Sequence, residues 1–471
     1  MIGLGVASAG LAIALLWSLL HRSESAEQGL LGSLGTELQQ WRPDVGAPSA
    51  SLIESAQAKV DEVPLSSSRL LPNGLTRTPL AAEAFERIKP LMGDAEARLI
   101  EVYQHIGQGN QRQALQLAEQ LVAQHPNFQL AQLVLGDLLS LQARPVRQLG
   151  DVPDTKAMAA QAQLDALREE SRRRLAALTE RPPEGRVPSQ ILALAAQSRH
   201  VIAVDASRSR LYLFENLSPP PGAAEQTAAP QLRLKSDFYI SVGLSGIEKV
   251  VEGDQRTPLG VYYITGNLDP AKLPDLYGSG ALPINYPNAL DVRRGKTGHG
   301  IGLHGTPSAQ FVRAPQASDG CVVLSNPDLE KLLSTVAIRT TPVIIAPELF
   351  WVEPGTLEQK RADFDQALTA WRTAKSQADP VQLRALYSDN FRAQGRDFQQ
   401  WWPRVAAELA QKGQREVRLS AVSMLHWRDT EDTMVVNFSE SVAGQSRSVS
   451  KRQYWGRENG QWKIFFEGPV G

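Results

Sequence analysis

The sequence predicts a multidomain protein with an N-terminal membrane helix, an all-α region, a mainly-β domain and an α+β C-terminal domain. The length of 471 residues exceeds what a single hydrophobic core normally organises. The hydrophobic period changes from helical to strand-like near residue 198, and near residue 355 it changes again to helices followed by strands. The net charge of −1 provides no basic footprint, so we expect no nucleic-acid partner.

The first 22 residues are predicted to form a transmembrane anchor. Residues 2–20 are apolar apart from Gly and Ser and carry no charge, and such a run is long enough to cross a hydrocarbon core of about 30 Å. Small residues at Ser23, Ser25 and Ala26 leave a cleavable signal peptide as the alternative. Residues 23–79 are rich in Ser, Gly, Pro and Gln, which predicts a spacer between the anchor and the folded parts.

Residues 80–182 are predicted to be helical. Apolar residues recur at three- and four-residue spacing, with breaks at residues 107–110 and 126–127. The region resembles a tetratricopeptide helix pair in its small residues and proline, namely Gly109, Ala114, Ala118, Pro126, Ala131 and Gly136. A plain helical bundle is the alternative. Because one repeat unit cannot bury both of its faces, we expect this region to pack on neighbouring helices or on a protein partner. Residues 181–188, RPPEGRVP, are a candidate linker.

Residues 198–347 are predicted to form the mainly-β domain. Residues 200–216 read as two strands around a polar turn at 206–208, and further strands are expected in 231–243, 253–266 and 341–347. A helix is predicted at 327–336, before the last strand. The chain has one cysteine and no paired metal-ligand spacing, so we expect no metal and no cofactor.

Residues 355–471 are predicted to form an α+β cone. Helices at 357–377, 380–387 and 397–411 precede long β-rich runs, and such a sequence of elements favours a curled antiparallel sheet covered by helices. The pattern resembles the nuclear-transport-factor-2-like fold in its YSDNF stretch and its terminal WKIFFEG strand. Five tryptophans could line a ligand cavity, although packing of the sheet is the favoured role; they are Trp401, Trp402, Trp427, Trp455 and Trp462.

The stretch 298–326 carries the candidate chemistry, because it contains Cys321 together with His299 and His304. A thiol within reach of an imidazole is the minimal equipment for thiolate catalysis, whereas a buried core cysteine is the plainer alternative. His304 ends a short apolar strand and precedes a glycine, so it can face an open cleft. His299 is interpreted as a loop residue rather than a second base.

Residues 318–320, just before the cysteine, have candidate supporting roles. Gly320 leaves backbone N–H groups unscreened, which suits an oxyanion hole. Ser318 and Asp319 could orient His304 or cap the helix that begins near residue 327. For Ser318, a simple turn residue is an equal alternative.

Five blocks, HVIAVDASRSRLYLF, SVGLSG, GDQRTPLGVYYI, GIGLHGT and SDGCVVL, together resemble the YkuD-type L,D-transpeptidase catalytic domain over about residues 198–347. The resemblance implies a β-sandwich in which Cys321 is the nucleophile and His304 is the general base and acid. It further implies that Gly305 and Thr306 lie at the substrate-binding site.

Two positions depart from the family pattern. Asp319 stands where many members have histidine, and the arginine common after the cysteine is replaced by Val322 and Val323. Arg293 and Arg294, with Lys296, could supply the missing positive charge to a substrate carboxylate. An exposed basic loop is the alternative interpretation of this cluster.

The resemblance implies acyl transfer on peptidoglycan stem peptides. Cys321 would attack the L,D bond after meso-diaminopimelate and release D-alanine, and a stem amine, a lipoprotein lysine or a free D-amino acid would resolve the thioester. Water as the acceptor would give a carboxypeptidase or endopeptidase instead. A non-catalytic scaffold of the cell envelope is the third hypothesis. We therefore expect a single-pass membrane protein whose body lies in the periplasm, with a possible protein partner for residues 80–182.

Overall fold

The computed structural model describes residues 82–152, 154–218 and 230–470. The predicted anchor at 1–22 and the spacer at 23–79 lie outside the described residues. Within the described ranges, the structure contains no helix that combines the length and the apolar character needed to span a bilayer. The account below concerns the compact unit that contains these ranges.

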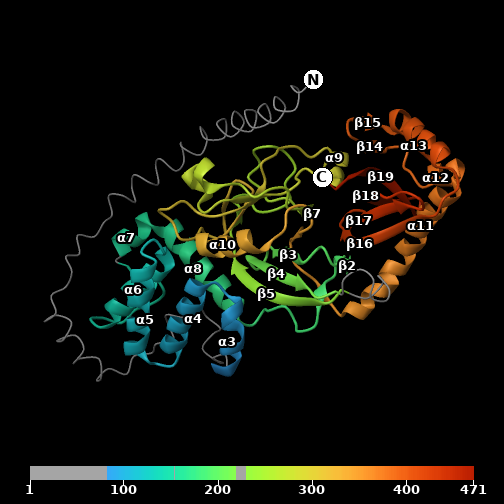
Figure 1. The fold of residues 1–471 in the computed structure, drawn as a ribbon. Helices are drawn as coiled ribbons and strands as arrows, with labels where there is room; N and C mark the ends of the chain where they lie inside the picture. Colours follow the sequence, from blue (N-terminus) through green and yellow to red (C-terminus); the bar gives the residue numbers. More distant parts are fainter. Residues whose placement is uncertain (1–81, 153, 219–229, 471) are drawn as a thin grey trace. The chain divides into compact units, whose positions relative to one another are not determined.

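The region predicted to be helical consists of short helices packed around one core (Figure 1). The three predicted helices are present and break at the predicted positions. Their apolar faces meet in a core that includes Leu99, Ile100, Leu121, Phe128 and Val134. The helices are α3 (Ala82–Ile88), α4 (Asp94–Gly107), α5 (Gln111–Gln124), α6 (Gln129–Leu141), α7 (Asp154–Ala159) and α8 (Gln161–Ala176).

The mainly-β domain is a sandwich of two principal sheets. The larger has the strand order β5-β4-β3-β12-β7, formed by Leu232–Tyr239, Arg210–Asn216, His200–Asp205, Pro342–Ala346 and Gly260–Tyr263. The smaller has the order β11-β9-β8, formed by Val322–Val323, Gly302–His304 and Ala281–Pro283. A parallel pair adds β10 (Gln316–Ser318) to β6 (Val242–Gly243). Apolar side chains of both principal sheets share one core, among them Ile202, Val204, Leu282, Leu303 and Val322. Helix α10 (Asn326–Thr335) closes this core with Leu329 and Leu332.

The C-terminal domain is a curled antiparallel sheet with helices α11 (Leu357–Gln377), α12 (Pro380–Ala385) and α13 (Phe398–Lys412). Its sheet has the order β19-β18-β17-β16-β2. The long strands are β16 (Val417–Arg428), β17 (Asp432–Val442), β18 (Val449–Glu458) and β19 (Gln461–Pro469). The edge strand β2 (Ile191–Ala193) precedes the mainly-β domain in the chain and pairs with β16. The mainly-β domain is therefore inserted, in chain order, into the sheet of its C-terminal neighbour.

The segment proposed as a linker is partly strand. β1 (Val187–Pro188) pairs with β13 (Trp351–Val352), which follows the mainly-β domain in the chain. Strands of two or three residues are too short to leave a period in the sequence. Their pairing is visible only once the distant partner strand is in place.

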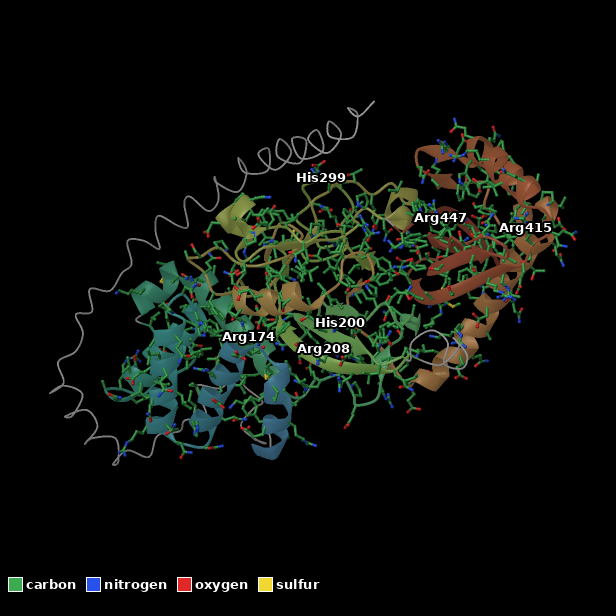
Figure 2. The ribbon with its side chains drawn as sticks, viewed as in Figure 1. Arg174, His200, Arg208, His299, Arg415 and Arg447 are labelled. Atoms are coloured by element: carbon green, nitrogen blue, oxygen red, sulfur yellow. The ribbon has the colours of Figure 1, made fainter. Side chains whose placement is uncertain are left out.

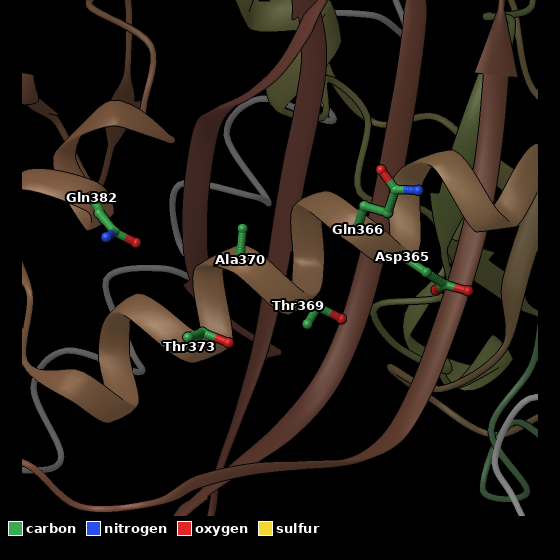
Figure 3. A pocket seen from close by; sticks show the side chains of 6 residues that line it. All are labelled: Asp365, Gln366, Thr369, Ala370, Thr373 and Gln382. Carbon is green, nitrogen blue, oxygen red and sulfur yellow. The ribbon is translucent and has the colours of Figure 1, made fainter.

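The tryptophans of the C-terminal domain pack its core. Trp455 is fully buried and Trp462 nearly so, while Trp401 and Trp402 are partly buried against the same core. Trp427 is buried in a second cluster, which the sheet shares with the mainly-β domain. The domain also carries a groove of about 460 Å³ on the outer side of α11 (Figure 3). No tryptophan lines it; its lining residues are Asp365, Gln366, Thr369, Ala370, Thr373 and Gln382.

A buried ion network joins the helical region to the larger sheet of the mainly-β domain. The Arg210 guanidinium donates to Glu96 of α4 at 2.8 Å and to Asp237 of β5 at 2.6 Å. Arg174 of α8 (Figure 2) lies 3.0 Å from the same Glu96 carboxylate. All four side chains are at most 3% exposed. Burial alone would raise the pKa of Glu96, but the two guanidinium groups hold that pKa below its ordinary value.

Replacing Arg210 by alanine is expected to lower the free energy of unfolding by about 3–5 kcal/mol, because two carboxylates would stay buried without this partner. Urea unfolding followed by tryptophan fluorescence measures the change. The control is Arg172→Ala, which breaks a surface pair whose arginine side chain is 57% exposed and should cost at most about 1 kcal/mol. Equal effects of the two substitutions would contradict a structural role for the network.

Candidate active site

In the smaller sheet, His304 ends β9 and Cys321 directly precedes the neighbouring strand β11. β11 runs parallel to β9, with Val322 paired to Leu303 and Val323 paired to His304. Leu303 and Val322 point into the core between the sheets. Because side chains alternate along a strand, His304 and Cys321 point to the opposite face. One strand spacing and a two-residue offset place their Cα atoms roughly 8 Å apart, a distance that an imidazole and a thiol can bridge.

The imidazole of His304 is held in one orientation. Its Nδ1 lies 2.7 Å from the carbonyl oxygen of Gly305, so Nδ1 carries the proton and Nε2 is left as the acceptor. The ring of Tyr277 packs beside it with centroids 5.1 Å apart. Burial lowers the pKa of His304 to about 4, helped by the positive charge of Arg313 and opposed by the Gly305 hydrogen bond and Asp319. The imidazole is therefore a neutral base at neutral pH.

The residues after His304 form a locked turn. A side chain at Gly305 would place its Cβ 2.0 Å from the Asn326 side-chain oxygen, so only glycine fits. That same oxygen accepts from the backbone N–H of Thr306 at 3.1 Å. The Thr306 side chain is buried, and its hydroxyl is directed to the carbonyl oxygens of Gln310 and Phe311 at 2.9 and 3.2 Å. The structure thus gives Gly305 and Thr306 a part in holding the His304 ring, and it buries the Thr306 side chain.

The turn before Cys321 is organised by Ser318. Its hydroxyl donates to the Cys321 carbonyl oxygen at 2.6 Å and accepts from the Gly320 N–H at 3.2 Å. Gly320 has φ +123, and a Cβ there would lie 2.7 Å from the Arg256 carbonyl oxygen. These bonds assign Ser318 to the turn rather than to His304. They also engage the Gly320 N–H, and the oxyanion role expected for the backbone N–H groups around Cys321 stays a prediction.

The sulfur of Cys321 lies at the surface of the site. Cys321 is half-buried, and its Sγ is 3.6 Å from the Gly300 carbonyl oxygen. Asp319 is exposed and accepts a hydrogen bond from the Gln255 side chain at 3.1 Å. His299 is an exposed loop residue paired with Glu252 at 3.4 Å, in agreement with the interpretation from sequence.

The basic cluster proposed for substrate binding faces the C-terminal domain instead. Arg294, after helix α9 (Ala289–Arg293), makes two 2.6 Å bonds to Asp429. Arg293 lies 3.2 Å from Glu458. Both arginines are thus engaged by carboxylates of another domain. The sequence cannot reveal this, because those carboxylates lie more than 130 residues further along the chain.

Arg313 is the cation that sequence reasoning missed. It is half-buried, and its Nη1 donates to the Ala317 carbonyl oxygen at 3.1 Å, in the strand that leads to Cys321. Its charge reaches His304, since it lowers the pKa of that imidazole. The only sequence signal was its position inside the stretch 298–326.

Comparison with known proteins identifies two domains in the chain. Residues 199–345 match the YkuD family, described as the L,D-transpeptidase catalytic domain, and residues 363–468 match the Cds6 C-terminal NTF2-like domain. Comparison with curated protein sequences found no match.

Two solved structures are similar to the chain. Bd1075 of Bdellovibrio bacteriovorus is 25% identical, with 60% of this chain and 98% of that chain covered at a TM-score of 0.49. The helical cell shape determining protein Pgp2 of Campylobacter jejuni is 22% identical, with 59% and 93% covered at a TM-score of 0.45. From the two family matches, the chain contains a YkuD-family L,D-transpeptidase catalytic domain followed by an NTF2-like domain of the Cds6 C-terminal type.

Proposed function

We propose that the protein is a cysteine acyltransferase that acts on the peptide stems of peptidoglycan. The observation that carries the proposal is the pairing of a neutral, oriented imidazole with the single cysteine on one face of a YkuD-family domain. In this site His304 Nε2 removes the thiol proton as Cys321 Sγ attacks the carbonyl carbon of the L,D bond after meso-diaminopimelate.

The reaction then proceeds through a thioester. The tetrahedral intermediate collapses, the carbon–nitrogen bond breaks, and the imidazolium of His304 returns its proton to the leaving amine of D-alanine. A primary amine of a second stem, a lipoprotein lysine or a free D-amino acid next attacks the thioester carbonyl. The new amide forms, the carbon–sulfur bond breaks, and the thiol is restored.

Hydrolysis of the thioester is the second candidate function. The Cys321 sulfur lies at the surface, so water can reach the acyl-enzyme. With water as the acceptor, the same two residues would give an L,D-carboxypeptidase or endopeptidase, and tetrapeptide stems would end as tripeptides.

Incubation of purified sacculi with the full-length protein separates the two functions. After muramidase digestion, new 3→3 cross-links or amine adducts would identify a transferase, whereas tripeptide stems without new cross-links would identify a hydrolase. The absence of both products would overturn the proposal for this substrate.

We further propose that residues 2–20 anchor the protein with its body in the periplasm. Protease digestion of spheroplasts should then degrade the body while the membrane stays intact.

Arg313 is proposed to bind a carboxylate of the stem peptide, in place of the arginine that Val322 and Val323 replace. Arg313→Ala is expected to raise KM about 10- to 100-fold, the loss typical of a charge-assisted hydrogen bond, while Arg313→Lys restores part of it. The substitution also removes a charge that lowers the pKa of His304, so the acid limb of kcat/KM should move to higher pH.

Kinetics on a synthetic tetrapeptide between pH 3.5 and 8 measure both effects of the Arg313 substitution. Arg233→Ala is the control, because this arginine forms an exposed pair with Glu215 in β4. An unchanged KM together with an unchanged acid limb in Arg313→Ala would refute the assignment.

A further inference from the structure

The loop after the candidate catalytic histidine is anchored in the helical region. Phe311 is 8% exposed and belongs to a hydrophobic core whose other buried members all come from the helical region. Its ring stacks on Phe128 with centroids 4.6 Å apart and an interplanar angle of 30°. The ring of His125 packs on it from a second side at 4.8 Å. A side chain of the catalytic domain thus completes the core of its neighbour.

Backbone hydrogen bonds fix the same contact. The N–H of Phe311 donates to the carbonyl oxygen of Asn127 at 3.1 Å. The side-chain amide of Asn127 donates to the Ser308 carbonyl oxygen at 3.0 Å. The turn between α5 and α6 therefore holds this loop at two backbone positions in addition to the stacked rings.

A short chain of contacts links the anchor to the imidazole. The Thr306 hydroxyl is directed to the carbonyl oxygens of Gln310 and Phe311. Thr306 follows Gly305, whose carbonyl oxygen receives the Nδ1 proton of His304. Movement of Phe311 out of its pocket would therefore release the group that orients the base.

The other end of the loop has a similar support. The carbonyl oxygen of Arg313 accepts from the Tyr239 hydroxyl at 3.2 Å. The guanidinium carbon of Arg174 in α8 lies over the ring of Tyr239, 4.0 Å from the ring centroid. The helical region thus contacts the loop directly at Ser308 and Phe311 and supports its end at Arg313 through Tyr239. His304 lies just before this loop, and the proposed carboxylate-binding arginine ends it.

We infer that the helical region is a structural part of the active site, and that Phe311 is a positioning residue that holds His304 and Arg313 in their working geometry. The inference rests on the proposed function for its activity readout. Its physical basis is the steep dependence of rate on geometry, because a displacement of about 1 Å can cost about 100-fold in rate. The contacts to the helical region help to offset the conformational entropy lost when the loop is fixed in this geometry.

The test compares Phe311→Ala and Phe128→Ala in the full-length protein, since each removes one ring of the stacked pair. We expect kcat to fall about 10- to 100-fold in both variants, with a smaller change in KM. Loss of the anchor should also expose His304 to solvent. The acid-side midpoint of kcat should then move from near pH 4 toward pH 6.5. Phe311→Leu keeps an apolar anchor and should recover most of the rate even if Phe311→Ala folds poorly.

The control is Leu138→Ala, which truncates another buried side chain of the same helical core. It should lower the melting temperature but leave kcat and the midpoint unchanged. If Phe311→Ala and Phe128→Ala behave like this control, the interface is only structural and the inference is wrong.

Alkylation separates this inference from the proposed function. The rate at which iodoacetamide modifies Cys321 needs no peptidoglycan, and Cys321 is the only cysteine in the chain. We expect imidazole-assisted alkylation to slow about tenfold in Phe311→Ala, with the same shift of midpoint. A wild-type protein that is inactive on sacculi but shows this alkylation pattern would refute the substrate while supporting the anchor. An unchanged alkylation profile in Phe311→Ala would refute the anchor.

Discussion

Replacing Cys321 by alanine is expected to reduce acyl transfer at least about 1,000-fold, because removal of a catalytic nucleophile typically costs that much or more. The measurement is the yield of modified muropeptides from sacculi to which this protein is added as the only enzyme. A second readout is intact mass after incubation with a carbapenem, whose strained amide should acylate the thiol. Cys321 is the only cysteine, so a thioester adduct reports on this residue alone.

Cys321→Ser is the matched control for this experiment. It keeps the size of the side chain and the hydrogen bonds of the turn held by Ser318, but it replaces a good nucleophile by a weak one. We expect no measurable turnover and an unchanged melting temperature. Turnover or a carbapenem adduct in Cys321→Ala would show that the chemistry lies elsewhere in the chain.

The strands and helices that the sequence predicts correctly are those with a local period. The hairpin β3–β4 and helix α11 lie where alternation and three- to four-residue spacing place them. The edge strand β2 and the pair β1–β13 were not predicted, because their stability comes from partners far along the chain. Short segments of this kind carry too few residues to show a period.

The candidate site likewise combines residues that a local motif predicts with contacts that depend on distant parts of the chain. His304 and Cys321 stand in motif blocks, and the register of β9 and β11 places them on one face. The finer roles follow from contacts that no motif records. Ser318 donates to the carbonyl oxygen of Cys321, and Arg294 is paired with Asp429. No motif shows that Arg313 is the cation near His304, because this depends on the three-dimensional position of the loop that carries Arg313.

The protonation state of His304 underlies the second prediction with a large expected effect. Burial, with the charge of Arg313, lowers the pKa of His304 to about 4, compared with about 6.5 for an ordinary histidine. The imidazole is therefore neutral at neutral pH, so in the proposed mechanism it can accept the thiol proton as the sulfur attacks. A preformed thiolate–imidazolium pair would require the opposite shift of the histidine.

Replacing His304 by asparagine is expected to lower kcat about 100- to 10,000-fold, because the general base is lost. The asparagine amide can still donate to the Gly305 carbonyl oxygen, so the turn after β9 should keep its shape. In the wild type, the acid limb of kcat/KM should have its midpoint near pH 4, and the residual activity of His304→Asn should lack that limb. A wild-type midpoint near pH 6.5 would show that the imidazole is not buried as described.

The same shift predicts how stability depends on pH. Between pH 6.5 and pH 4 the unfolded chain protonates His304 while the folded protein does not, so the unfolded state binds more protons and stability falls as the pH falls. The full contribution is about 3 kcal/mol. The difference in free energy of unfolding between wild type and His304→Asn should therefore change by this amount from pH 7 to pH 4, as measured by urea unfolding. A difference that stays constant with pH would mean that His304 titrates alike in both states, and the neutral-base mechanism would lose its physical support.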